Sequence, residues 1–257
     1  MRRERAPIWI AILAAIGAAF FVVPLIGLVV KTPWGDALQS LTSTDTLEAL
    51  KLSLIASLSA TAVSLVLGVP LAWIYARIDF PGRTVLRALT TLPMVLPPVV
   101  GGIALFLAFG RRGLVGSLLD TTFGITLPFT TAGVVFAETF VAMPFLVLTV
   151  EAGLRSMDRR YEDAARTLGA RRWTVFTRVT LPLIAPSLLA GAVLCWARAL
   201  GEFGATITFA GNFTGVMQTM PLAVYLLIES NRPEGSFILS LLLLLVSLAV
   251  IVELRHR

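Results

Sequence analysis

The chain has 257 residues, of which 57% are hydrophobic and 14% charged, and its mean hydropathy is +0.88. An ordinary soluble domain is about 25% charged, so this composition excludes a soluble globular fold and indicates a membrane protein. The formal net charge is +6, but most basic residues lie between apolar blocks, where they set membrane topology rather than bind nucleic acid. The one cysteine, Cys195, excludes an internal disulfide.

Apolar blocks of roughly 20 residues, the length that crosses about 30 Å of hydrocarbon, predict an all-α protein with six transmembrane helices. They cover about residues 8–30, 50–76, 89–109, 131–154, 183–209 and 235–254. The first block follows a basic N-terminus, as a secretory signal would. It exceeds the usual signal core and lacks a cleavage site, so we expect it to remain as a span. Residues 1–257 are expected to form a single transmembrane domain.

The distribution of basic residues predicts the orientation of the chain. An even number of spans places both termini on one side, and the more basic side is cytoplasmic. Five basic residues fall opposite the termini: Lys31, Lys51, Arg111, Arg112 and Arg232. Fifteen arginines fall on the side of the termini: Arg2, Arg3, Arg5, Arg77, Arg83, Arg87, Arg155, Arg159, Arg160, Arg166, Arg171, Arg172, Arg178, Arg255 and Arg257. Both termini are therefore expected in the cytoplasm.

The third span is irregular because Pro93, Pro97, Pro98, Gly101 and Gly102 crowd its first half. Helix breakers are tolerated in a membrane only where protein or a wet cavity satisfies the freed backbone groups, so this span should lie inside the bundle. Two interpretations stay open. Either Pro97, Pro98 and Gly101 belong to a broken helix beside a translocation path, or they form a kink that only helps packing.

A long basic loop, residues 155–182, joins the fourth span to the fifth. Asp158 is a candidate N-cap for a short helix from Arg159 to Leu168, which Gly169 is placed to end. A second short helix is expected to run towards Pro182. Four apolar side chains of this loop are expected to be buried against another surface: Leu168, Trp173, Val175 and Phe176.

The spacing within the 155–182 loop is specific. Asp163, Ala164 and Ala165 are followed after three residues by Gly169, and after nine more by Val179, Thr180, Leu181 and Pro182. The two alanines give the first helix a flat face that another protein's backbone could approach closely. An amphipathic loop lying on lipid would explain the basic residues but not this spacing.

The spacing resembles the membrane subunits of bacterial ATP-binding cassette importers, whose cytoplasmic loop reads Glu-Ala-Ala, three residues, Gly, nine residues, Ile-x-Leu-Pro. Here Asp163 replaces the glutamate and Val179 the isoleucine. The resemblance implies a type I importer fold with its core at about residues 50–254, and a coupling helix seated in a separate ATPase subunit. The chain has no G-x-x-x-x-G-K-[ST] loop, so ATP and Mg are expected on that partner, and this chain is expected to bind no cofactor.

The fifth span carries a charged pair, Arg198 and Glu202, four residues apart on one helical face. Gly201 and Gly204 permit close helix packing. One interpretation places Arg198, with Thr206, in an anion path, and the other makes the pair an internal brace. We favour the brace, because a neutralised arginine offers little net attraction to a dianion.

Three segments resemble molybdate permeases: Arg198 to Asn212, the Leu-Pro-Pro-Val-Val-Gly-Gly run at 96–102, and Gln218 to Tyr225. Sulfate and thiosulfate permeases share a similar Arg-x-Leu-Gly-Glu-Phe-Gly core, so the cargo stays open between these and molybdate or tungstate. The resemblance implies a homodimer in the bacterial inner membrane that imports its anion by alternating access. Its implied partners are two ATPase subunits and an extracytoplasmic oxyanion-binding protein.

The remaining residues predict no catalytic site and no metal site. His256, the only histidine, lies in a basic tail, and no His or Cys cluster has metal-ligand spacing. Glu138 is an unpaired acid in the fourth span, facing the bundle interior or lying near the outer boundary. A membrane enzyme would need an intramembrane catalytic pair, and a passive channel would need no coupling loop, so neither class is expected.

Overall fold

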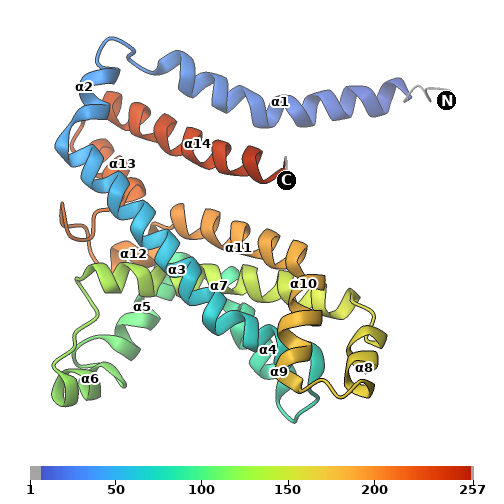
Figure 1. Ribbon diagram of the computed structural model, residues 1–257. Helices are drawn as coiled ribbons and strands as arrows, with labels where there is room; N and C mark the ends of the chain where they lie inside the picture. The colour runs from blue at the N-terminus through green and yellow to red at the C-terminus, as the bar shows by residue number, and fades with distance from the viewer. Residues whose placement is uncertain (1–6, 256–257) are drawn as a thin grey trace. The chain divides into compact units, whose positions relative to one another are not determined.

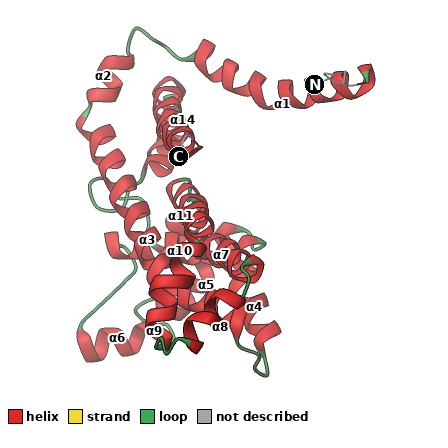
Figure 2. Cartoon of the chain, turned by 45° about the vertical axis from the view of Figure 1, so that its right-hand side comes forward, coloured by secondary structure: helices red, strands yellow, loops and turns green. Residues whose placement is uncertain are grey.

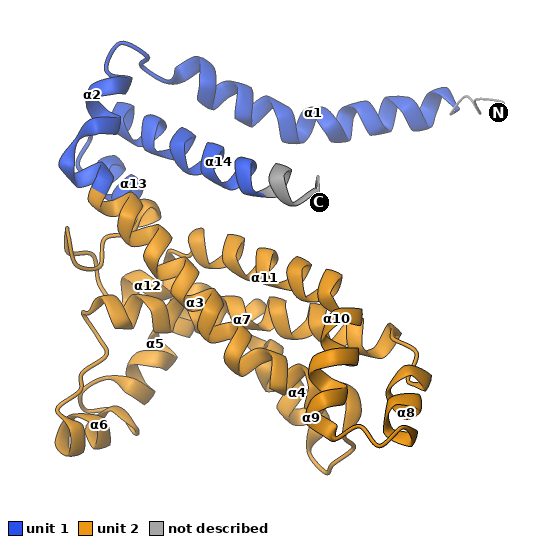
Figure 3. Cartoon of the chain, viewed as in Figure 1, with its two compact units in different colours: residues 1–47, 223–257 blue, residues 48–222 orange. Residues whose placement is uncertain are grey.

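The computed structural model describes residues 7–255, and the side chains of residues 7–250. In this part of the chain it contains helices, turns and loops but no strand (Figure 2), which confirms the predicted all-α class. The basic termini used for the orientation, Arg2, Arg3, Arg5 and Arg257, lie outside the described residues, as does His256. The helices divide into two compact units, residues 1–47 with 223–257 and residues 48–222 (Figure 3).

The first unit contains α1 (Ile8–Lys31), α2 (Ala37–Thr42) and α14 (Pro233–Arg255). The unit also includes most of α13 (Met220–Glu229). α1 lies beside α14 (Figure 1), and both are long and apolar enough to cross a membrane. None of the side chains of α1 is buried, as expected for a helix whose apolar surface is covered by lipid. These helices match the predicted first and last spans within a few residues.

The second unit is built around α3 (Thr44–Arg77), α7 (Thr131–Ser156) and α11 (Ala185–Leu200). α11 packs along α7 (Figure 1). Small residues from these helices form much of the core, including Ala60, Ala72, Ala142 and Ala199. Because lipid tails are as apolar as leucine, helices associate in a membrane through close packing, and small side chains permit it.

The predicted third span is not a single helix. α4 (Arg83–Thr91) continues into the 3-10 turn η1 (Leu92–Met94), and α5 (Pro98–Phe109) leaves the break at an angle of 119° to them. Pro98 occupies the first position of α5, where its missing N–H would have no partner in any case. A change of direction this large is a broken helix rather than a kink.

The predicted fifth span, 183–209, is also divided, so the expectation of one helix there is wrong. α11 ends at Leu200, and α12 (Gly204–Phe209) begins after a break at residues 201–203. Oε1 of Glu202 accepts a hydrogen bond from the N–H of Ala205 at 2.7 Å. The Glu202 side chain therefore satisfies a free backbone donor at the start of α12, which favours a new helix over a continuation of α11.

Within residues 7–255, four helices could each cross a membrane by length and composition: α1, α3, α7 and α14. Two bent pairs raise the number to six if each counts as one span. The first pair is Arg83–Met94 with Pro98–Phe109, and the second is Arg172–Leu183 with Ala185–Leu200, bent by 73°. The six predicted spans are therefore recovered only with both broken spans included. Another short helix, α6 (Gly116–Phe123), lies between α5 and α7 in the chain.

Candidate coupling loop and translocation site

The first helix of the 155–182 loop is α8 (Arg160–Thr167), one residue shorter at each end than predicted. Asp158 lies at its start, where Oδ1 accepts a hydrogen bond from the N–H of Arg160 at 2.9 Å. A carboxylate in this place satisfies a backbone donor that the helix itself leaves free.

Gly169 ends α8. Its φ is +82°, and its N–H donates to the carbonyl of Arg166 at 2.9 Å, while the N–H of Ala170 donates to the carbonyl of Ala165 at 3.0 Å. These two bonds form the Schellman arrangement, in which the residue after the cap takes the left-handed conformation that glycine adopts without strain.

The second half of the loop runs from α9 (Arg172–Val175) through the π-helical turn η2 (Phe176–Thr180) into α10 (Leu181–Leu183). The N–H of Leu181 donates to the carbonyl of Phe176, five residues back. Pro182 follows directly. Because proline has no N–H and its ring clashes with the carbonyl four residues earlier, that of Arg178, the preceding turn widens.

Glu162 fastens the loop to the rest of the second unit. Its Oε1 lies 3.3 Å from Nη2 of Arg77 at the end of α3, and it accepts a hydrogen bond from the Thr180 hydroxyl at 2.7 Å. One buried carboxylate thus joins α8 to both α3 and η2. Sequence reasoning missed this residue, although it stands beside Asp163.

Apolar side chains remain uncovered on the loop. Leu168 is 89% exposed and Trp173 73% exposed, whereas Val175 is buried and Phe176 packs against the core of the second unit. Two of the four residues expected to need cover therefore find it within this chain, and two do not. The other residues of the spacing pattern, Asp163, Ala164, Ala165, Val179, Leu181 and Pro182, are exposed or half-buried.

A second buried carboxylate, also missed by sequence reasoning, is Glu151 near the end of α7. It pairs with Nη2 of Arg155 at 2.8 Å and with Nε of Arg87, in α4, at 3.1 Å. Nη2 of Arg155 also donates to the carbonyl of Tyr75 in α3 at 3.2 Å. These contacts hold α3, α4 and α7 together.

The structure brings Arg198 and Glu202 together at the α11–α12 break. Nη2 of Arg198 lies 2.5 Å from Oε2 of Glu202, and the Glu202 side chain is 1% exposed. Since Oε1 of Glu202 also accepts the bond from Ala205, this carboxylate is both ion-paired and engaged with the backbone. Such geometry suits an internal brace.

α5, the second half of the broken third span, packs against α12, the short helix that follows the break after α11. A Cβ on Gly204 would lie 2.7 Å from the Pro98 side chain, and a Cβ on Gly102 would overlap Thr208. Gly101 is buried against Phe140 of α7, while Pro97 and Pro98 are exposed. Glycine is therefore required at this crossing, because any side chain would push the helices apart.

Unpartnered polar groups lie within the same bundle. The Thr206 hydroxyl is buried and has no hydrogen-bond partner among the described residues. Glu138 is also buried, and its Oε2 likewise has none. Glu138 therefore faces the bundle interior, which decides between the two positions left open by the sequence.

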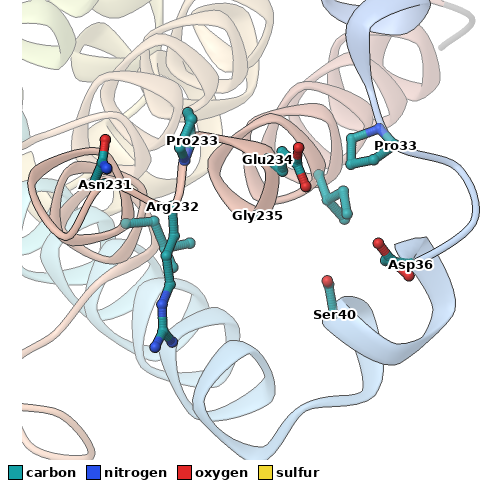
Figure 4. Close-up of a pocket in the computed structure, with 10 residues that line it drawn as sticks. Pro33, Asp36, Ser40, Asn231, Arg232, Pro233, Glu234 and Gly235 are labelled. Atoms are coloured by element: carbon teal, nitrogen blue, oxygen red, sulfur yellow. The ribbon is translucent and has the colours of Figure 1, made fainter.

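The first unit contains a polar cavity of about 530 Å³, shown in Figure 4. It lies between the α1–α2 link, α2 and the start of α14. Asp36, Ser40, Asn231, Arg232 and Glu234 supply its polar groups. Sequence reasoning used only Arg232 here, as a topological marker, because residues so far apart in the chain carry no pattern that joins them.

Apolar helices around broken spans, with a basic two-helix loop that leaves Leu168 and Trp173 exposed, are features of a membrane-embedded transport subunit. The chain belongs to the family of binding-protein-dependent transport system inner membrane components, and the match covers residues 64–256. It is therefore a multi-pass component of a transport system that works with a binding protein.

The sequence matches several curated proteins over most of its length. It is 45% identical to the molybdenum transport system permease protein ModB of Mycobacterium tuberculosis (strain ATCC 25618 / H37Rv), over 98% of this chain and 94% of that protein. It is 44% identical to ModB of Escherichia coli (strain K12), over 79% and 90%. The sulfate transport system permease protein CysT of Escherichia coli (strain K12) is 38% identical, over 86% and 81%.

Solved structures show the same fold. A bacterial ABC transporter involved in the import of the acidic polysaccharide alginate matches with a TM-score of 0.75 at 20% identity, over 97% of this chain and 93% of that chain. The alginate transporter in complex with its alginate pentasaccharide-bound periplasmic protein gives a TM-score of 0.75 at 19% identity, over 97% and 92%. This likeness confirms the predicted type I importer fold.

Proposed function

We propose that this chain is the permease subunit of an ATP-driven importer that carries molybdate, and also tungstate, into the cytoplasm by alternating access. The observation that carries the proposal is the 155–182 loop, where the spacing from Asp163 to Pro182 folds into two short helices with Leu168 and Trp173 exposed. The relatives named for molybdenum transport, at 43–45% identity, support the cargo.

In this proposal, α8 is the coupling helix and seats in a groove of a separate ATPase subunit that binds ATP and Mg. The flat face at Ala164 and Ala165 permits close approach, and the partner covers Leu168 and Trp173. When ATP closes the ATPase subunits, α8 moves with them. The contacts of Glu162 with Arg77 and Thr180 pass that displacement to α3 and to the start of the fifth span.

The translocation path in this proposal runs beside the two broken spans. Exposed backbone at a helix break is tolerated in a membrane where it lines a cavity, and such breaks carry binding regions in other transporters. Pro97, Pro98, Gly101 and Thr206 contribute to the path, and the Arg198–Glu202 pair braces it at the α11–α12 break. Two copies of the chain form the channel, since each has one coupling loop and a pair of ATPase subunits offers two grooves.

The positive-inside rule places both termini and the 155–182 loop in the cytoplasm. The cavity formed by Asp36, Ser40 and Arg232 (Figure 4) then faces the extracytoplasmic side, where the oxyanion-binding protein docks. Molybdate, tungstate and sulfate are all tetrahedral dianions, so the permease cannot sort them by charge. Discrimination lies in the binding protein, whose rigid donors fit the longer metal–oxygen bonds.

The test is uptake by proteoliposomes that contain this chain with its ATPase subunits and its cognate binding protein. Labelled molybdate should accumulate only when ATP is present inside the vesicles. Excess tungstate should compete strongly and excess sulfate weakly. Efficient competition by sulfate would favour the sulfate permease alternative, and equal uptake without ATP would contradict ATP-driven import.

A further inference from the structure

A basic cavity of about 640 Å³ lies between the end of α3 and the 155–182 loop. Its walls come from α3, α8, α9 and η2, all within the second unit. Six charged side chains line it: Arg77, Arg159, Glu162, Asp163, Arg166 and Arg172. We call it the loop cavity.

The charges of the loop cavity do not balance. Glu162 pairs with Arg77 and Asp163 with Arg166, each at 3.3 Å. Arg159 donates to the carbonyl of Ala76, which carries no formal charge, and Arg172 has no ion-pair partner in residues 7–250. Two positive charges are left uncompensated, which is the amount that one dianion would neutralise.

Arg77 supplies a second, independent observation. Its side chain is 7% exposed, and its Nε is buried without a hydrogen-bond acceptor in the described part of the chain. A buried donor with no partner is costly, and buried polar groups are satisfied almost everywhere in proteins. Guanidinium groups bind tetrahedral oxyanions through parallel N–H bonds, so an oxyanion in the loop cavity would provide the missing acceptor once the Arg77 side chain turns its buried Nε towards the cavity.

Arginines beside a membrane span ordinarily set its topology and stay in solvent. Arg160 and Arg171 fit that description, because both are exposed and neither lines the loop cavity. Their immediate neighbours Arg159 and Arg172 line the same cavity as Arg77. Topology alone does not explain this convergence.

We propose that the loop cavity binds a phosphate-type tetrahedral oxyanion with two negative charges, and that the bound oxyanion fastens the 155–182 loop to α3. The oxyanion is either free in solution or the phosphomonoester headgroup of a lipid. This inference goes beyond the proposed transport function. Its test measures binding without transport, so either proposal can fail while the other stands.

The experiment uses the full chain purified in a neutral detergent. Inorganic phosphate is titrated at pH 8 and constant ionic strength against a chloride control, and short-chain phosphatidic acid is titrated against short-chain phosphatidylcholine. Apparent affinity is read from the thermal unfolding midpoint, because a ligand that binds the folded state raises it with concentration. Hydrogen exchange of residues 159–180 should slow on binding. Saturation by phosphate identifies a free anion, and saturation by phosphatidic acid alone identifies a headgroup.

The chain offers matched variants one residue apart. Arg159→Gln and Arg172→Gln each remove one charge from the loop cavity and should weaken binding at least about tenfold. Arg160→Gln and Arg171→Gln remove the same charge outside it and should change binding less than about twofold. All four positions are exposed, and far-UV circular dichroism checks their folding. No saturable binding of either probe, or an equal loss in all four variants, would overturn the proposal.

Discussion

The carboxylate of Glu162 lies 3.3 Å from the guanidinium of Arg77, and both side chains are less exposed than 8%. Glu162→Gln keeps the hydrogen bond from Thr180 but leaves the arginine buried without a counter-charge. Breaking a buried pair costs about 3–5 kcal/mol, so the thermal unfolding midpoint and ATP-driven uptake should both fall. Asp163→Asn is the matched control for the unfolding midpoint, because its pair with Arg166 is exposed and contributes about 0–1 kcal/mol. Equal effects of the two variants on the unfolding midpoint would contradict a structural role for the Glu162 contact.

Gly169→Val should impair coupling because it strains the backbone, not because the new side chain clashes with a neighbour. No atom lies within 4 Å of a Cβ at this position, but φ is +82°. A β-branched residue in that conformation costs about 1–2 kcal/mol, so the turn after α8 should distort and uptake should fall while the subunit still inserts in the membrane. Gly169→Asn should retain most activity, since asparagine tolerates the left-handed region. Normal uptake by Gly169→Val would count heavily against the coupling-helix proposal.

Trp173→Ala should weaken association with the ATPase subunit without destabilising the chain. The side chain is 73% exposed, so its removal leaves no cavity in the fold. A tryptophan buried at an interface often contributes about 2 kcal/mol or more, roughly a 30-fold change in Kd, measurable by co-purification or titration. Val175→Ala, at a buried neighbour, should instead lower the unfolding midpoint. Unchanged ATPase binding by Trp173→Ala would exclude this side chain from the interface.

The Arg198–Glu202 brace is tested by a double-mutant cycle. Arg198→Met leaves a buried carboxylate unpaired and should destabilise by about 3–5 kcal/mol. Glu202→Gln keeps an acceptor for the N–H of Ala205, so Arg198→Met with Glu202→Gln should be milder than Arg198→Met alone. Unfolding midpoints in detergent measure all three variants. A double mutant no more stable than the Arg198→Met single mutant would remove the brace interpretation.

Gly102→Ala should disrupt the crossing of α5 and α12, because the added methyl would overlap Thr208 and lie 2.9 Å from the carbonyl of Ala205. Overpacking of this kind costs about 1–3 kcal/mol, and uptake should fall with stability. Gly17→Ala in α1 is the control, since nothing lies within 4 Å of its Cβ. It should leave the unfolding midpoint unchanged or slightly raised. Equal tolerance of both alanines would show that α5 and α12 do not need this close approach.

The sequence predicted features that depend on local pattern. Apolar blocks located the spans, and the residues from Asp158 to Gly169 predicted α8 within one residue at each end, because capping and left-handed turns are decided by neighbouring residues. The proline cluster predicted an irregular third span but not the bend of 119°, since bend angle depends on what packs against each half.

Features that depend on distant residues were not predicted. Glu162 pairs with Arg77 across 85 positions, and Glu151 pairs with Arg87 of another helix. No periodicity links such residues before the chain folds. The division at residues 201–203 was missed for a related reason: apolar residues continue on both sides of it, and the bond from the N–H of Ala205 to Glu202, which marks the start of the second helix, forms only in the folded chain.

The π-helical turn Phe176–Thr180 determines how Trp173, before the turn, is rotated about the helix axis relative to α10, after it. A π turn is equivalent to one extra residue inserted in an α-helix, and each residue of an α-helix turns the chain by about 100°. If the same residues between Trp173 and Leu181 formed a regular α-helix, without the wide turn that absorbs the extra residue, Trp173 would be rotated by about that angle around the helix axis relative to α10. The number of residues between Gly169 and Val179, together with the wide turn, therefore sets the direction in which the exposed indole of Trp173 projects relative to the helix that leads into the membrane.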